Sequence, residues 1–259
     1  MAGLAPWLSA EPSASDWQTV WSYAANNQPL EAKAMLGEMT AGESRTRELA
    51  EAILALARTP LAEGDWHKLE PRFAHLAAGD DDVAAQAQYL QARMHQVQKA
   101  VPDYARADAL FAELARRWPE SHWTQLSYVK LALVALYSGD GAVHKRMSTA
   151  ESLLAKITEP PLRRDLQLQL GWAALEYELP LTEVLPHLIA ADEVSGLLGI
   201  TPEDLVIQIG ELSLRAGDAA RAKRYFERFL RDYPSNPKCF NVTQRLVDAN
   251  HALVRKAAP

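Results

Sequence analysis

One spacing pattern recurs along the chain about every 38 residues. In its clearest form, an aspartate is followed by alanine after four residues, by large apolar residues after eight and eleven, and by proline after sixteen. Two copies have this form, and they start at Asp103 and Asp218. The alanine and the two apolar residues share one face of a helix, because a helix repeats about every 3.6 residues. A helical unit repeated at this period predicts a stacked array.

Four weaker copies keep the apolar spacing of this pattern. The copy at Asp65 lacks only the proline, whereas the copy at Asp140 needs a short insertion before its apolar positions. The steps between successive starts are 37, 38, 37, 40 and 38 residues, which predicts six units. The six starting residues are Gln28, Asp65, Asp103, Asp140, Pro180 and Asp218.

A second amphipathic helix is predicted immediately before each of these segments. In four units a small residue lies about twelve residues before the first core position of the second helix: Ala57, Ala132, Gly171 and Gly210. A small or missing side chain lets two crossing helices approach closely. Each unit is therefore predicted to be a helix–turn–helix pair.

The last unit resembles a known repeat family. The residues that carry the resemblance are Gly210, Gly217, Asp218, Ala222, Phe226, Leu230 and Pro234, and together they closely resemble the tetratricopeptide repeat pattern. The register of that repeat fits residues 203–236 without a gap, and the Asp103 copy matches in its second helix. The other four copies match only in hydrophobic spacing. The resemblance implies an all-α, right-handed superhelix of about six tetratricopeptide-like repeats.

The expected organisation has three parts. Residues 1–15 form a lead-in segment, residues 16–236 form the repeat array, and residues 237–259 form a C-terminal capping helix and tail. Repeat arrays need caps that hide their exposed end face. An apolar stripe is expected to pack this helix against the last repeat, with polar residues outside: Phe240, Leu246, Val247, Leu253 and Val254.

Composition narrows the classes of function. The formal net charge of −6 disfavours nucleic-acid binding, which needs a basic face for phosphates. No apolar run approaches the roughly 20 residues of a membrane-spanning helix, and the first residues lack the basic start and apolar core of a secretory signal. The sequence leaves the compartment open between the cytoplasm and the periplasm.

The sequence predicts no enzyme, cofactor or metal site. It contains no HExxH, Walker, GxGxxG or GxSxG motif, and its seven histidines do not have the spacing of a helical zinc site. The single cysteine, Cys239, is expected to be structural rather than nucleophilic. A helical scaffold of a cell-wall enzyme is the less favoured alternative, because it needs a catalytic glutamate in a compact non-repeat domain and the chain leaves no room for one.

The tetratricopeptide resemblance implies a concave groove lined mainly by the first helices. Lysine, arginine and asparagine clamp a C-terminal carboxylate in some members of the family, but here only Arg58 and Lys99 lie at candidate positions. The centre is apolar and aromatic instead, which favours an apolar peptide or helix of another protein, since aromatic side chains make strong anchors. The predicted groove residues are Trp17, Trp21, Arg58, Tyr89, Gln96, Lys99, Leu126, Val129, Leu133, Tyr137, Leu168, Trp172, Leu175, Ile207 and Glu211.

This hypothesis describes a non-catalytic interaction scaffold, and it leaves alternatives open. The same apolar residues could be core, or the groove could be filled by the chain's own N-terminal segment or by a second copy. A sensory module that binds a small ligand or signal peptide would instead have an apolar pocket closed on all sides. The segment FERFLRDYPSNP also resembles repeats of bacterial envelope proteins that assist outer-membrane assembly, so envelope or complex assembly is one expected role.

Overall fold

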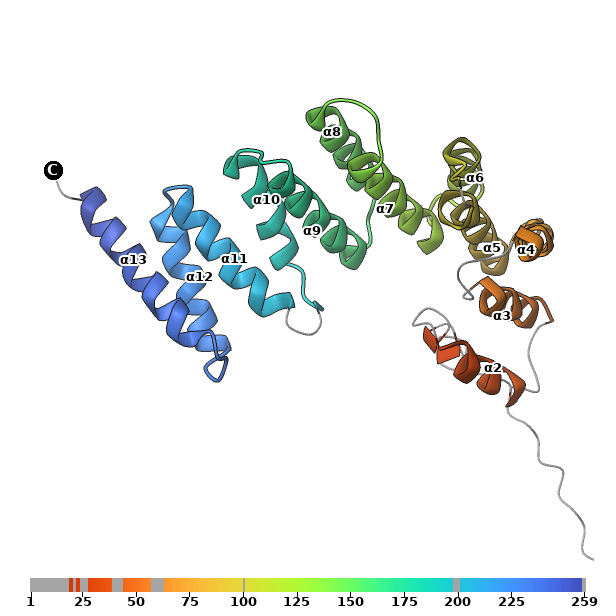
Figure 1. The fold of residues 1–259 in the computed structure, drawn as a ribbon, viewed down its shortest axis with the longest axis horizontal. Coiled ribbons are helices and arrows are strands. Elements are labelled where there is room, and N and C mark those ends of the chain that lie inside the picture. The colour runs from red at the N-terminus through yellow and green to blue at the C-terminus, as the bar shows by residue number, and fades with distance from the viewer. Residues whose placement is uncertain are drawn as a thin grey trace, which may run out of the picture. The chain divides into compact units, whose positions relative to one another are not determined.

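The protein is helical throughout the part of the chain that is described. The computed structural model describes residues 19–20, 22–23, 28–38, 44–56, 63–99, 101–197 and 201–257. These residues contain twelve α-helices, α2 to α13, and one π-helix, η1, and no strand (Figure 1). The all-α helical-repeat fold predicted from the sequence is confirmed, while the handedness of the superhelix stays a prediction.

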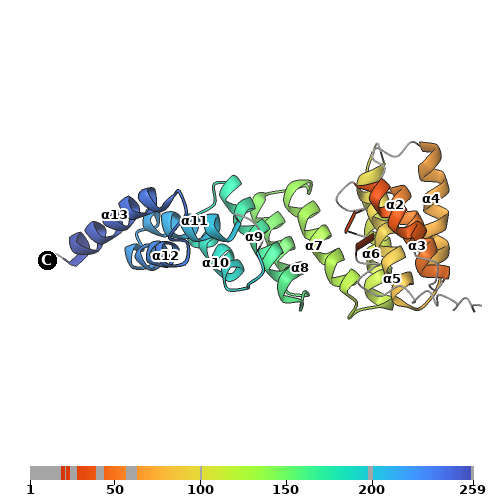
Figure 2. The same ribbon diagram turned by 90° about the horizontal axis from the view of Figure 1, so that it is seen from below.

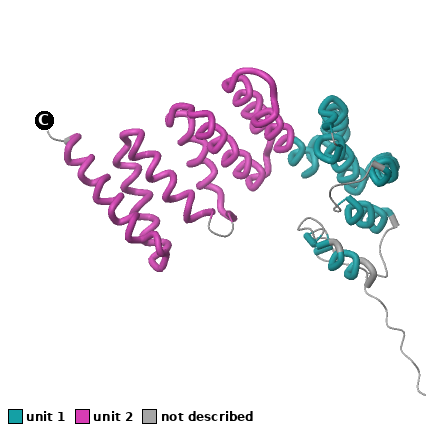
Figure 3. Tube along the Cα trace, viewed as in Figure 1, with its two compact units in different colours: residues 1–127 teal, residues 128–259 magenta. Residues whose placement is uncertain are grey.

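The chain divides into two compact units (Figure 3). Unit 1 comprises residues 1–127 and unit 2 comprises residues 128–259. Helix α7 (His122–Tyr137) contains the boundary, so its first turns belong to unit 1 and the rest to unit 2. Each unit is described below by itself.

In unit 1, each helix packs on the next one along the chain. Its buried core includes Phe73, Tyr89 and Phe111, which come from three successive helices. A π-helix, η1, continues directly from α5, so the first helix of this hairpin changes its hydrogen-bond pattern before it ends. The elements are α2 (Pro29–Glu38), α3 (Ser44–Leu56), α4 (Glu63–Leu76), α5 (Asp82–Arg93), η1 (Met94–Gln98) and α6 (Tyr104–Arg117).

The loop between α4 and α5 is held by side chains from other helices. The Arg117 guanidinium donates to the carbonyls of Ala77 and Gly79 at 2.8 and 2.6 Å, and Arg45 donates to the Asp81 carboxylate at 2.9 Å. Asp81 caps α5 by accepting from the backbone N–H of Ala84 at 2.9 Å. A short polar loop thus fixes the angle between two helices.

Unit 2 contains the clearest hairpins. Helices α9 and α10 pack on each other, as do α11 and α12, and α13 packs on α12. In Figures 1 and 2 these helices follow one another in chain order. The elements are α8 (Val143–Leu154), α9 (Pro160–Glu176), α10 (Leu181–Asp192), α11 (Thr201–Arg215), α12 (Ala219–Asp232) and α13 (Cys239–Ala257).

The small residues predicted at helix crossings do lie at close contacts in unit 2. A Cβ on Gly210 would lie 2.5 Å from the Phe226 ring of α12, and a Cβ on Gly171 would lie 2.4 Å from the Leu188 side chain of α10. Ala132 of α7 is fully buried, and Ala57 lies outside the described residues. A larger residue at 171 or 210 would force the facing Leu188 or Phe226 side chain, or the paired helices, to shift.

The positions of the second helices agree with the repeat period. These helices begin at residues 29, 63, 104, 143, 181 and 219, each within three residues of the predicted start. Asp103 and Asp218 are true helix caps, because each carboxylate accepts a backbone N–H three residues later. Asp65, by contrast, lies inside α4, and Asp140 lies before α8 begins.

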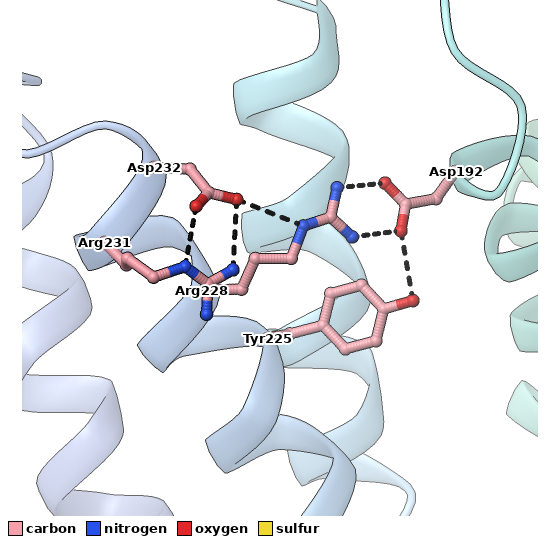
Figure 4. Close-up of polar contacts among 5 residues, drawn as sticks. All are labelled: Asp192, Tyr225, Arg228, Arg231 and Asp232. Atoms are coloured by element: carbon pink, nitrogen blue, oxygen red, sulfur yellow. Dashed lines mark hydrogen bonds and ion pairs between the residues drawn. The ribbon is translucent and has the colours of Figure 1, made fainter.

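A buried carboxylate links the second helices of the last two hairpins (Figure 4). Asp192, at the end of α10, accepts two hydrogen bonds from the Arg228 guanidinium of α12, at 2.5 and 2.9 Å, and one from the Tyr225 hydroxyl at 3.2 Å. The hydrogen bond to Asp192 raises the pKa of Arg228. Burial, reinforced by the Asp192 charge, raises the pKa of Tyr225 to about 12. This two-pronged pair fixes the spacing of successive repeats.

Five apolar residues of the C-terminal helix were predicted to pack against the last repeat, and the prediction is wrong for three of them. Phe240, Val247 and Val254 are 73%, 41% and 69% exposed. The face that packs on α12 is centred on the buried residues Val242 and Ala249 instead, with Leu246 beside them. Small residues suit this contact because α13 lies close to α12, so the larger side chains are directed elsewhere. A capping role for residues 237–259 stays a prediction.

Candidate functional site

The first helices of unit 2 share a face on which polar side chains pair from helix to helix. The Tyr137 hydroxyl of α7 donates to Oε1 of Gln169 on α9 at 3.2 Å. The Trp172 indole of α9 lies 3.5 Å from Oε1 of Gln208 on α11, which makes this second hydrogen bond a weak one. These pairs place α7, α9 and α11 side by side along one face.

A hollow of about 490 Å³ lies at the end of this face, between α11 and α13. Its apolar floor contains Ile207 and the buried Val242, which both belong to the core cluster around Phe226. The hollow is open to solvent rather than closed on all sides. Its lining residues are Asp204, Ile207, Gln208, Glu211, Lys238, Asn241, Val242 and Arg245.

Two ion pairs join the opposite walls of the hollow. Lys238 lies one residue before α13, and its Nζ is 2.5 Å from Oδ1 of Asp204 on α11. Nε of Arg245 on α13 is 3.6 Å from Oε1 of Glu211 on α11. All four side chains are about half exposed, so neither pair contributes much to folding. The two positive charges balance the two negative ones. This part of the face therefore suits an apolar or uncharged group better than a strongly charged one.

Two partly exposed aromatic side chains lie on the same face of α7, α9 and α11. Tyr137 is 48% exposed and Trp172 is 38% exposed. Tyr137 donates to the Gln169 amide and the Trp172 indole lies near the Gln208 amide, while part of each ring stays open to solvent. Burial is the main cause that raises the pKa of Tyr137, so its hydroxyl acts as a neutral hydrogen-bond donor. Half-exposed aromatic rings are suited to anchoring a partner.

The predicted groove residues of unit 2 separate into two groups. Tyr137, Trp172, Ile207 and Glu211 are brought together on the face described above. Leu133 and Leu175 are half-buried, and Val129 and Leu168 are buried at 6% and 5% exposure. The buried pair lies in the core of the unit rather than in an open groove.

The predicted groove residues of unit 1 are mostly enclosed. Tyr89 is 5% exposed and packs on Phe111 and Trp123, with ring centroids 6.0 and 5.6 Å away, and burial raises its pKa to about 12. Gln96 is 2% exposed and accepts a hydrogen bond from Arg93. Two other predicted residues, Lys99 and Leu126, are half-buried. Trp17, Trp21 and Arg58 lie outside the described residues.

Several residues of the candidate site were missed by sequence reasoning. Gln169 and Gln208 lie on predicted first helices, one residue after a predicted groove position, so helical spacing could have included them. Lys238, Asn241 and Arg245 were missed because residues 237–259 were interpreted only as a cap. Interpreting α13 as the first helix of a further unit would have found them.

Two further properties of the described residues concern metal ions and membranes. No group of three or more histidine, cysteine, aspartate or glutamate side chains in the described residues is arranged to hold a metal ion. None of the described helices combines the length and the apolar character needed to span a membrane. The side chains on this face are aromatic rings, amides and balanced charges.

Comparison with known proteins adds one finding. Residues 207–236 match a family model described as a tetratricopeptide repeat. The match covers α12 and most of α11, and it contains three of the residues that line the hollow from the α11 side: Ile207, Gln208 and Glu211. No curated protein has significant sequence similarity to the chain.

Proposed function

The chain is a tetratricopeptide-like helical-repeat protein, a class of scaffold for protein–protein interaction, and we propose that it binds a peptide or helix of another protein on the first-helix face of unit 2. The observation that carries this proposal is the alignment of two oriented aromatic side chains with the open hollow. Trp172 contacts Gln208, and Gln208 is also a lining residue of the hollow. The aromatic pair and the hollow therefore form one continuous surface.

The partner segment that fits this surface is amphipathic. An apolar side chain of the partner seats over Ile207 and Val242, because the hollow has an apolar floor and no net charge. The amide oxygen of Gln208 accepts a hydrogen bond from the Trp172 indole, so the NH₂ group of the same amide is left to donate a hydrogen bond to a carbonyl of the partner. A hydrogen bond to the partner's backbone does not depend on the partner's sequence. Contacts with Ile207, Val242 and the two aromatic rings depend on the partner's side chains and provide specificity.

The open form of the hollow favours this proposal over a sensory module for a small ligand. Ligand pockets bury most of the ligand's surface, and this hollow is open along one side. The tetratricopeptide family is typically non-catalytic, and the proposal involves no reaction. Because the segment FERFLRDYPSNP resembles repeats of envelope assembly proteins, envelope proteins are the first group in which to seek the partner.

The proposal is tested by affinity capture from a lysate of the source organism, followed by calorimetry with the captured segment. Trp172→Ala is expected to weaken binding by about 30-fold, the equivalent of about 2 kcal/mol for an aromatic anchor. Tyr104→Ala is the matched control, because Tyr104 is also 38% exposed but lies on α6 of unit 1. Circular dichroism and melting verify that both variants fold.

Two results would contradict the proposal. If folded Trp172→Ala binds the captured segment as tightly as the wild type, the first-helix face of unit 2 is not the docking surface. If Tyr104→Ala weakens binding as much as Trp172→Ala, the partner docks elsewhere.

A further inference from the structure

A half-buried arginine of unit 1 has neither a carboxylate nor a carbonyl partner among the described residues. Arg93 is the last residue of α5, and its guanidinium donates one hydrogen bond, to the side-chain amide oxygen of Gln96 on η1. No described aspartate or glutamate contributes to its pKa. An arginine has about five N–H donors, so most of the donors of Arg93 are left without an acceptor from the described residues.

The other half-buried arginines of the described chain all donate to charged or carbonyl oxygens. Arg117 donates to two backbone carbonyls of the loop between α4 and α5, and Arg228 donates to both oxygens of Asp192. The rest likewise reach a backbone carbonyl or a carboxylate: Arg45, Arg72, Arg146, Arg163, Arg164 and Arg221. The arginine at the end of α5 is the exception to this rule.

The amide of Gln96 adds a second unsatisfied donor beside this guanidinium. Gln96 is 2% exposed, and because arginine can only donate, the amide oxygen is the atom that faces Arg93. The NH₂ group of the same amide is buried and has no hydrogen-bond partner among the described residues. The pair therefore carries a positive charge and an excess of donors, and what it lacks is a negatively charged acceptor.

The described neighbours of Arg93 do not neutralise its charge. Tyr89 lies one turn earlier on the helix and is 5% exposed, and burial raises its pKa to about 12, so its hydroxyl is neutral at physiological pH. The Asp103 carboxylate is already used, because it pairs with Lys99 at 3.5 Å and caps α6. Burial lowers the pKa of Arg93 itself. A charge that is partly removed from water without a counter-ion destabilises the folded state.

The pair lies where the first helix of this hairpin changes its hydrogen-bond pattern. The π-helix η1 begins at Met94, directly after Arg93, and contains Gln96. π-turns are rare and often occur at functional sites. Arg93 is four residues after Tyr89 and three before Gln96, and such spacings place side chains on one face of a helix. The unsatisfied guanidinium therefore belongs to the first-helix face of unit 1.

We propose that Arg93, held by Gln96, binds an oxyanion, which is a carboxylate or phosphate group. The planar guanidinium binds either group through two parallel N–H···O hydrogen bonds. The buried Gln96 amide holds the guanidinium in one orientation before the anion arrives, which reduces the entropy lost on binding. This site lies in unit 1, so the proposal does not rest on the surface proposed in unit 2.

The test titrates the full chain with acetate and with inorganic phosphate, against chloride at constant ionic strength, and follows the Nε–H signal of Arg93 by NMR. This signal is expected to shift and saturate with an oxyanion but not with chloride. Arg93→Lys keeps the charge but not the planar fork, and is expected to raise the dissociation constant about 10-fold. Arg106→Lys is the matched control, because Arg106 is an exposed arginine on α6 of the same unit. Tighter binding of acetate indicates a carboxylate of a protein partner, and tighter binding of phosphate indicates a phosphate-bearing ligand.

Thermal unfolding gives a second measurement of the same binding. A ligand that binds only the folded state raises the melting temperature, so the preferred oxyanion is expected to stabilise the wild type more than chloride does. Arg93→Met is expected to lose this excess, whereas Arg106→Met keeps it and corrects for the general effect of phosphate on proteins. The proposal is overturned if the Arg93 signal of the wild type shows no saturable shift, if folded Arg93→Lys binds as tightly as the wild type, or if Arg93→Met keeps the full excess. The Trp172 experiment concerns unit 2, so each proposal can fail without the other.

Discussion

The hairpins α5–η1–α6 and α11–α12 have nearly the same second helix and different first helices. Asp103 and Asp218 cap the two second helices, accepting from the backbone N–H three residues later at 3.1 and 3.0 Å. Phe111 and Phe226, eight residues after each cap, are 1% and 0% exposed. The second helices therefore place equivalent rings in the two cores.

The first helices differ at the position eight residues before the capping aspartate. In α11 this residue is Gly210, and the ring of Phe226 lies directly against it. In the other hairpin the equivalent residue is His95, at which the helix is π-helical. The His95 ring lies beside Trp66 of α4, 5.2 Å between centroids, while Phe111 packs on Tyr89 instead. A large residue at the crossing position is accommodated by widening the helix and turning the side chain away from its hairpin partner.

This accommodation leaves polar atoms without partners. Among the described residues, neither ring nitrogen of His95 has a hydrogen-bond partner, and the nearest carboxylates, of Glu70 and Asp103, are 3.7 and 3.9 Å away. A buried polar atom without a partner destabilises the folded state. A small residue at the crossing therefore gives a well-packed hairpin, whereas a large one introduces a local weakness. π-turns are rare and often occur at functional sites.

The largest expected effect tests what the hairpins share. Phe226→Ala and Phe111→Ala should each lower the free energy of unfolding by about 3–5 kcal/mol, because each removes a fully buried ring from a core. Urea unfolding followed by circular dichroism measures the loss. If one variant loses less than about 1 kcal/mol, the two second helices are not equivalent in packing.

A second prediction concerns the contact between successive second helices. Asp192→Asn should destabilise unit 2 by about 2 kcal/mol, because the half-buried Arg228 guanidinium loses the charge of its two-pronged partner. Asp248→Asn is the control, since Asp248 and its partner Arg245 are both more than half exposed and such pairs contribute roughly 0–1 kcal/mol. Equal effects of the two substitutions on thermal unfolding would show that the Figure 4 contact is only a surface ion pair.

A third prediction tests the steric role of the crossing residue. Gly210→Ala should destabilise the protein by about 1–2 kcal/mol, because overpacking against Phe226 outweighs the roughly 1 kcal/mol that alanine gains over glycine in a helix. Gly64→Ala, where an added Cβ meets nothing within 4 Å, should be neutral or slightly stabilising. A melting temperature for Gly210→Ala at or above that of the wild type would mean that Phe226 can move aside.

The sequence predicted the hairpins because the apolar spacing of a second helix, such as α12, marks the face that is buried. Ala222, Phe226 and Phe229 were assigned to the core in this way, and all three are fully buried. Spacing could not predict the π-helix at His95, because the apolar pattern of so short a segment does not distinguish a π-turn from an α-turn. It also could not show that Tyr89 is buried, since exposure depends on the neighbouring hairpin. On the candidate face, Trp172 was predicted, but its partner Gln208 depends on the distance between two helices.

The smallest expected effect is a pH dependence of stability that comes from His95. Burial is the main cause that lowers its pKa, nearby Lys99 lowers it further, and Glu70 and Asp103 oppose both. Because the folded pKa lies below the unfolded value of about 6.5, the unfolded chain binds more protons in the interval between them, and stability falls as pH drops through that interval. Burial also lowers the pKa of His187, so unit 2 contributes a change of the same sign.

Urea unfolding between about pH 7 and pH 5 measures this dependence. His95→Ala should flatten the fall in stability without abolishing it, because His187 still contributes. If His95→Ala and the wild type lose stability equally over this range, the imidazole is not held neutral by burial. The contrast between the glycine crossing and the histidine crossing would then be one of shape alone.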